Sequence, residues 1–265
     1  MKVQILSDLH NEFLRNGERV LSHQWSGTIP ETDAEIIILA GDIDTGTSGV
    51  EWAIVESERL GKPVLYVLGN HEFYGHEYWG LKEKILNLCQ DTQVFCLDSG
   101  EFILDDVRFL GTTLWTNYKA DIRVPQDLAM FYVDRFLTDH RRIIIKTDDS
   151  DGRFKPEHAL AIHLKELRWL ETQLAQSIDA KTVVISHHGP HAVCQHPDFP
   201  LNEMTAAFHS DLGALIESSR IDSWVFGHTH ANVDEVVFDT RIVSNQAGYP
   251  GENVSGFDAC FTIEI

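Results

Sequence analysis

The chain has 265 residues, enough to bury a full hydrophobic core, and its hydrophobic content of 43% is ordinary for a soluble globular protein. Its 41 acidic and 21 basic residues leave a formal net charge of −20, which disfavours nucleic acid as the main partner because such a surface repels polyanions. No apolar run is long enough to span a membrane, and the first strand begins at Lys2 with no room for a signal peptide, so we expect a cytoplasmic protein. The cysteines, without any C-x-x-C spacing, indicate reduced thiols.

The N-terminal part of the chain predicts two strands that each end at polar residues. Lys2–Leu6 is a short apolar strand, and Asp8 and His10 follow it at once. If the backbone stays extended there, the D-x-H spacing points both side chains the same way, so that they can share one cation. The fully apolar run Glu35–Ala40 is typical of a central strand covered on both faces, and Asp42 follows its end.

A third strand, residues 64–68, carries the motif around which the chain is organised. A helix over residues 50–60 precedes it, so the segment predicts a β-α-β unit with parallel strands. The strand stops at Gly69, and Asn70 and His71 follow side by side in a loop. Polar groups collect on loops beyond strand ends because the sheet fixes them while the loop exposes them.

The second half of the chain repeats this arrangement. Strands over residues 182–186 and 223–226 end at His187-His188 and at His228-Thr229-His230. Helices are expected over residues 77–88, 155–176 and 204–218. Short strands over 94–97, 101–104 and 107–111 are expected to begin a second, more antiparallel sheet, with further short strands over 233–237, 241–244 and 257–264.

Residues 119–155 break the pattern and predict an insertion or lid beside the site. The segment carries mixed charge, a possible helix over residues 125–137 and the basic pair Arg141 and Arg142. The competing interpretation is that the segment has only a structural role and its arginines pair with surface carboxylates, because charge runs are usually solvated.

Five motifs follow predicted strands in the order D-x-H, G-D, G-N-H-E, H-H-G-P and G-H-T-H, between Ser7 and His230. Each motif is weak alone, but the ordered set resembles the calcineurin-like metallophosphoesterase superfamily. The resemblance implies an α/β fold in which two β-sheets form a sandwich flanked by helices, a four-layer αββα arrangement. We therefore expect a single domain over residues 1–265, with the insertion at 119–155.

The resemblance also implies a pair of metal ions. One would be bound by Asp8, His10, Asp42 and His230, and the other by Asp42, Asn70, His187 and His228, so that Asp42 is shared. His71 matches the family's catalytic histidine. His187 and His188 are adjacent, and family patterns favour His187 as the ligand and His188 as a phosphate contact.

The donor types agree with this assignment on chemical grounds. Mixed nitrogen and oxygen donors without thiolate suit Mn or Fe, with Zn or Ni as alternatives. A hydroxide held between two such ions needs no protein base and can attack phosphorus. His71 would stabilise the developing charge and protonate the leaving oxygen, since imidazole titrates near neutrality.

The sequence thus predicts a dinuclear-metal phosphoesterase that acts on a small phosphorylated molecule. A phosphodiester is slightly favoured, because no arginine lies within the metal-binding motifs and Trp115 and Tyr118 could form an aromatic wall. The alternative is a phosphomonoesterase or protein phosphatase that takes its arginine from Arg141 or Arg142. A nuclease is disfavoured by the net charge. A metal-binding scaffold without activity is disfavoured because all eight family positions are filled.

Overall fold

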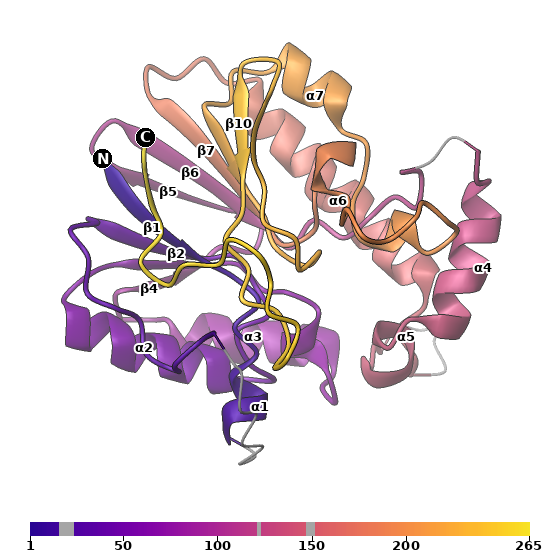
Figure 1. Cartoon of the computed structure of the whole chain (residues 1–265), viewed down its shortest axis with the longest axis horizontal. Helices are drawn as coiled ribbons and strands as arrows, with labels where there is room; N and C mark the ends of the chain where they lie inside the picture. The colour runs from indigo at the N-terminus through magenta and orange to yellow at the C-terminus, as the bar shows by residue number, and fades with distance from the viewer. Residues whose placement is uncertain (16–23, 121–122, 147–151) are drawn as a thin grey trace.

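Two β-sheets lie face to face in the computed structural model, which describes residues 1–15, 24–120, 123–146 and 152–265 (Figure 1). The first sheet consists of four parallel strands and one antiparallel edge strand. Its order is β11 (Thr262–Glu264), β1 (Lys2–Leu6), β2 (Ile36–Leu39), β3 (Val64–Tyr66) and β4 (Val94–Cys96). The expected strand over 94–97 therefore belongs to this sheet, because it pairs in parallel with β3.

The second sheet is mixed, and the expectation of a more antiparallel sheet is wrong for its centre. Its order is β5 (Gly100–Leu104), β6 (Val107–Thr112), β7 (Lys181–Ser186), β8 (Ser223–Val225), β10 (Thr240–Val243) and β9 (Asp234–Val237). The pairs from β6 to β10 are parallel, and only the two edge hairpins are antiparallel. Long crossovers such as the one through α6 (Pro156–Leu174) return the chain to the same end of the sheet, which produces this parallel centre.

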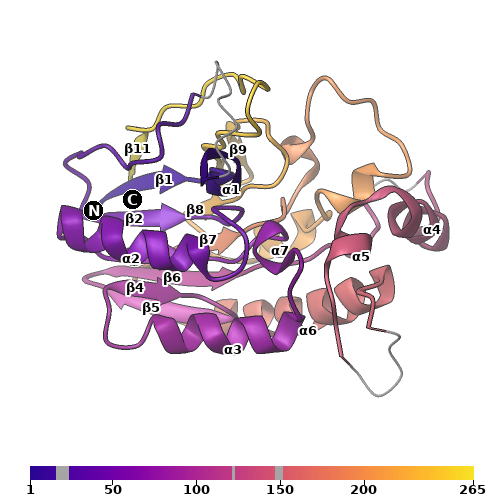
Figure 2. The same ribbon diagram turned by 90° about the horizontal axis from the view of Figure 1, so that it is seen from below.

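Helices cover the outer faces of both sheets and complete four layers, which confirms the predicted fold class (Figures 1 and 2). Alternate residues of β2 face opposite cores: Ile36 and Ile38 pack between the sheets, whereas Ile37 and Leu39 pack toward the helices. Helices α2 (Ser48–Leu60) and α3 (Tyr78–Leu88) lie on the first sheet, and α6 (Pro156–Leu174) and α7 (Gly213–Ser218) on the second. Burial on both faces explains why these strands read as continuous apolar runs.

Two predicted elements are much shorter than expected. The helix expected over 204–218 is a 3-10 turn, Thr205–Ala207, followed by α7, because the intervening backbone bonds to Gly189 and Pro190 instead of to itself. The strand expected over 257–264 is only β11, since Thr262–Glu264 is the part of that segment that pairs with β1 in a ladder. Among the described residues, no helix combines the length and apolarity that a membrane crossing requires.

The predicted insertion carries α4 (Gln126–Phe136) and α5 (Asp139–Arg142), which lie at one end of the sandwich (Figures 1 and 2). Its acidic stretch, residues 148–151, lies outside the described residues. The division into one domain with a lid stays a prediction. The chain also forms α1 (Asn11–Arg15) and two further 3-10 turns, His71–Phe73 and Ala192–Cys194.

Candidate metal centre

The parallel strands bring the sequence motifs to one edge of the sandwich. Asp8 and His10 follow β1, Asp42 follows β2, and Asn70 follows β3. From the second sheet, His187 follows β7, while His228 and His230 follow β8. Carboxyl ends of parallel strands meet at the same edge, so segments far apart in sequence deliver their polar side chains to one place.

Several of these residues have a left-handed backbone, which corrects the expectation that the D-x-H segment is extended. The φ angles are +53° at Asp8, +48° at His10 and +54° at Asp42, with His228 and His230 also positive. Such angles in non-glycine residues are costly and cluster at functional sites, where surrounding contacts enforce them. Here the backbone N–H of Asp8 donates to the Gly41 carbonyl at 3.0 Å, and that of His10 donates to the Asp42 carbonyl at 3.1 Å.

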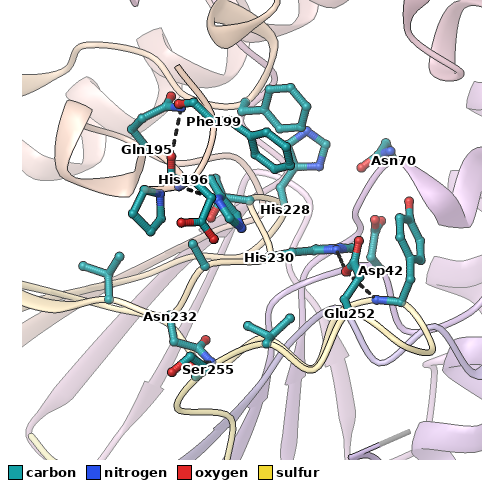
Figure 3. A pocket seen from close by; sticks show the side chains of 18 of the residues that line it. Asp42, Asn70, Gln195, His196, Phe199, His228, His230, Asn232, Glu252 and Ser255 are labelled. Atoms are coloured by element: carbon teal, nitrogen blue, oxygen red, sulfur yellow. Dashed lines mark hydrogen bonds and ion pairs between the residues drawn. The ribbon is translucent and has the colours of Figure 1, made fainter. Parts of the chain in front are cut away.

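The first cluster of donors, hereafter the Asp8 group, consists of Asp8, His10 and His230. One ligand atom from each lies within 4.8 Å of the others. Nε2 of His230 is 3.4 Å from Asp8 Oδ1 and 3.2 Å from His10 Nε2. On its other side, His230 Nδ1 lies 2.5 Å from Glu252 Oε2, an outer contact that orients the ring (Figure 3).

The second cluster, hereafter the His187 group, consists of Asp42, His187 and His228, again within 4.8 Å. His187 Nε2 is 3.4 Å from Asp42 Oδ1 and 3.0 Å from Asn70 Oδ1, while its Nδ1 is held 2.8 Å from the Ala40 carbonyl. Nε2 of His228 is buried without a hydrogen-bond partner. An unpaired buried nitrogen beside a carboxylate is the environment that a cation would satisfy.

His71 lies between the two clusters and forms a third group with His10 and Asp42. Its Nδ1 is 2.9 Å from Glu12 Oε1, and its Nε2 is 2.8 Å from the hydroxyl of Tyr249. Burial disfavours charge on Glu12, but its hydrogen bonds with His10 and His71 lower its pKa to about 2. Despite burial, Asp42 and Glu12 raise the pKa of His71. The sequence stretch D-x-H-x-E contained Glu12, whereas nothing in the sequence pointed to Tyr249.

The donor set fits divalent cations. Burial opposes charge on His187, yet the adjacent Asp42 raises the pKa of His187 to about 9. In the same way, Asp8 and Glu252 raise the pKa of the buried His230 to about 10. The protons therefore occupy the positions between carboxylate and imidazole that cations would take, and metal binding must displace them. Gly69 leaves the space for this arrangement, since a Cβ there would collide with the Asp42 carboxylate.

Glu72, the last residue of G-N-H-E, fixes the two loops that carry Asp42 and Asn70. Its carboxylate accepts from the backbone N–H groups of Asp42, Ile43 and Gly69 at 2.8–3.1 Å. Burial and the nearby Asp42 raise the pKa of Glu72 to about 7. This residue therefore supports the ligand loops and does not face the donor clusters as a ligand.

The expected substrate contacts lie mostly in the core. Trp115 and Tyr118 are each 2% exposed and do not line the cavity, and the Trp115 indole donates to Tyr78 at 3.2 Å. His188 is buried against Trp115 and His228, and burial lowers its pKa to about 3. It can accept or donate a hydrogen bond as a neutral ring, but it cannot offer positive charge near neutrality.

The two arginines behave differently. The Arg142 guanidinium lies 4.7 Å from the centre of the Tyr74 ring, and that ring lies 4.2 Å from His71. The Arg141 side chain donates to the Arg135 carbonyl. Neither arginine lines the cavity at the candidate site.

A cavity of about 950 Å³ opens over both clusters (Figure 3). One wall is formed by residues 195–199, and the opposite wall by Tyr249 and residues 252–255. Its other aromatic lining residues are Tyr74, Phe199 and Phe208. Among the described lining residues there is no lysine or arginine, whereas Asp139, Asp198, Asp234, Glu235 and Glu252 all contribute carboxylates.

This fold and its paired donor clusters define a metal-dependent hydrolase, and comparison with known proteins identifies the family. The family model described as calcineurin-like phosphoesterase matches residues 1–232, so the chain belongs to that family and is a phosphoric ester hydrolase. An uncharacterized protein of Acanthamoeba polyphaga mimivirus is 24% identical over 272 residues, which cover 94% of this chain and 92% of that protein.

Solved structures share the fold. Phosphopantetheinyl hydrolase from Mycobacterium tuberculosis superposes with a TM-score of 0.69 at 15% identity, covering 94% of this chain and 90% of that one. A protein of Thermus thermophilus gives a TM-score of 0.50 at 14% identity, covering 92% and 88%. At these identities the likeness extends to architecture alone.

Proposed function

We propose that this protein is a dinuclear metallophosphoesterase that hydrolyses a small phosphodiester. One ion would be held by the Asp8 group with Asp42, and the other by the His187 group with Asn70. The bound ions would supply Lewis-acid activation of water and charge stabilisation at phosphorus. Mn or Fe suits the mixed nitrogen and oxygen donors best, and Zn or Ni is compatible.

The observation that carries this proposal is the position of Asp42 between the two clusters. Its Oδ1 is 3.4 Å from His187 Nε2, and Asp42 also forms a donor group with His71 and with His10 of the Asp8 group, with ligand atoms within 4.8 Å of one another. No other carboxylate belongs to more than one of the donor groups found in the described part of the chain. A carboxylate that belongs to two adjacent donor groups is suited to hold two cations close together, as enzymes that displace a group at phosphorus require.

His71 is suited to act on the substrate and not on the ions. Glu12 lies 2.9 Å from its Nδ1, so that Nε2 points toward the hydroxyl of Tyr249, a residue that lines the cavity. A carboxylate on one ring nitrogen fixes the tautomer and orientation of the ring and favours its protonated form. We propose that His71 donates a proton to the departing oxygen.

The charge of the cavity supports a diester over a monoester. A monoester dianion needs extra positive charge on its non-bridging oxygens, but the described lining offers several carboxylates and no lysine or arginine. A diester carries one negative charge and a second organic arm. The cavity of about 950 Å³ has room for that arm, and Tyr74, Phe208 and Tyr249 can contact it.

The test compares bis-nitrophenyl phosphate with nitrophenyl phosphate after reconstitution with Mn²⁺. The diester should have the higher kcat/KM. If the monoester is favoured by about tenfold or more, and Arg142→Ala removes that advantage, the protein is a phosphomonoesterase. Arg141→Ala is the matched control, because the Arg141 side chain donates to the Arg135 carbonyl, whereas the Arg142 guanidinium lies over the Tyr74 ring.

A further inference from the structure

The side-chain amide of Asn70 is held at both ends. Its Oδ1 lies 3.0 Å from His187 Nε2, on the side of the His187 group. Its Nδ2 donates to Asp139 Oδ1 at 2.9 Å and approaches the Tyr74 hydroxyl at 3.2 Å. An amide has an acceptor at one end and donors at the other, so the partner of its nitrogen determines which way its oxygen points.

Asp139 is a partner that permits only one amide orientation. A carboxylate accepts hydrogen bonds and cannot donate them, so a flipped Asn70 would direct its oxygen at a negative group and its N–H₂ at the cation position. Asp139 is 1% exposed and belongs to α5, 69 residues away in the chain. Its Oδ1 also accepts from the Tyr74 hydroxyl at 2.6 Å, and its Oδ2 is buried without a hydrogen-bond partner.

The segment that carries Asp139 is attached to the loop that follows Asn70. The backbone N–H of Gly75 donates to the Arg142 carbonyl at 2.8 Å, and that of Ile144 donates to the His76 carbonyl at 3.0 Å. The N–H of Tyr78 in turn donates to the Ile144 carbonyl at 2.8 Å. Three backbone hydrogen bonds over four residues fix the relative position of the two segments, so this part of the predicted lid is a fixed wall of the site.

We infer that Asp139 is a positioning residue for Asn70 and thereby raises the affinity of the His187 group for its metal ion. This inference rests on the proposed metal ligands, but not on the phosphodiester preference. Outer partners that orient a ligand typically contribute 10- to 100-fold to metal affinity. The insertion would then be a constituent of the metal centre, because it supplies a group that the five sequence motifs do not contain.

The test measures Mn²⁺ binding directly, by equilibrium dialysis with elemental analysis over a range of free Mn²⁺. In Asp139→Ala, one of the two ions should need roughly 10- to 100-fold higher free Mn²⁺ for half-saturation, while the other ion binds as in the wild type. Asp139→Asn, which keeps the volume, should give a smaller loss. Asp127→Asn in the same segment is the control, since Asp127 is exposed and should leave both ions unchanged.

A double-mutant comparison separates positioning from general destabilisation. If Asp139 acts through Asn70, Asp139→Ala should weaken Mn²⁺ binding no further in an Asn70→Ala background. Excess Mn²⁺ should also restore kcat in Asp139→Ala. The inference is overturned if both variants at Asp139 bind two ions like the wild type, or if the loss is the same with and without Asn70. A protein that binds both ions in this manner but cleaves no phosphoester would refute the proposed function and leave the role of Asp139 intact.

Discussion

Metal binding should release protons, because two candidate ligand histidines with raised pKa values, His187 and His230, each lie against a carboxylate. In the ion-free protein, His187 has a pKa of about 9 and His230 of about 10, so both are protonated at neutral pH. A histidine must give up this proton before its ring nitrogen can bind a cation. Because one of these residues belongs to each cluster, each ion that binds should displace about one proton.

The structure also gives the size of the effect. A pH of about 7 lies about two units below the pKa of His187 and about three below that of His230. Competition from the proton should therefore reduce the apparent affinity for the metal ion roughly 100-fold at the His187 group and roughly 1,000-fold at the Asp8 group. Each affinity should therefore rise about tenfold per pH unit above neutrality. The rise should level off as the pH passes the pKa of the histidine concerned, because no proton then remains to be displaced.

Calorimetric titration with Mn²⁺ in buffers of different ionisation enthalpy counts the released protons. We expect about two protons for two ions near neutral pH, and fewer as the pH approaches 9–10. His76→Asn is the matched control, because His76 is exposed and belongs to none of the donor groups. Two ions that bind near neutral pH without proton release, or with affinity independent of pH, would refute the reasoning.

Three substitutions test individual residues. Asp42→Asn should reduce the Mn content measured by elemental analysis and abolish turnover, because a neutral amide holds two dications poorly; two retained ions with near-normal turnover would contradict the ligand assignment. His71→Ala should keep both ions but lose about 10²–10⁴ in kcat, with a smaller deficit for nitrophenolate leaving groups. An equal deficit for good and poor leaving groups would indicate charge stabilisation without proton donation. Tyr249→Phe removes a single hydrogen bond to His71 and should lower kcat by about three- to tenfold with unchanged metal content; no change in kcat would assign Tyr249 to packing alone.

The residues that converge from parallel strands could be predicted from the sequence for a physical reason. A strand that is buried on both faces can be recognised in the sequence as a continuous apolar run. The first polar residues after it must lie at the carboxyl edge of its sheet. Asp42, Asn70 and His187 each follow such a run, so their approach to one another depends on the strands being parallel within each sheet and on the two sheets packing with their carboxyl edges together. The choice of His187 over His188 agrees with the donor groups, although it came from the family pattern and not from chain geometry.

The residues that the sequence did not reveal belong to segments whose position depends on tertiary contacts. Asp139 lies on a four-residue helix whose location follows from backbone pairing with residues 75–78. Tyr249 comes after the last motif, in a loop that Glu252 holds through the Tyr249 backbone N–H at 2.8 Å. Neither residue has a periodic pattern or a characteristic spacing around it, and so nothing in the local sequence distinguishes it from an ordinary surface aspartate or tyrosine.

The left-handed backbone of the ligand loops depends on contacts with residues that lie outside the sequence motifs. A non-glycine residue at positive φ costs roughly 1–2 kcal/mol, and Asp8, His10, Asp42, His228 and His230 all have positive φ. Contacts from outside the motifs offset that cost: the His230 N–H donates to Gln246 at 2.6 Å, and the Gly248 N–H donates to the Asp8 carbonyl at 3.1 Å. The motifs therefore supply the donor atoms, while the segment after β10 holds the backbones of Asp8 and His230 in a conformation that these residues would not adopt alone.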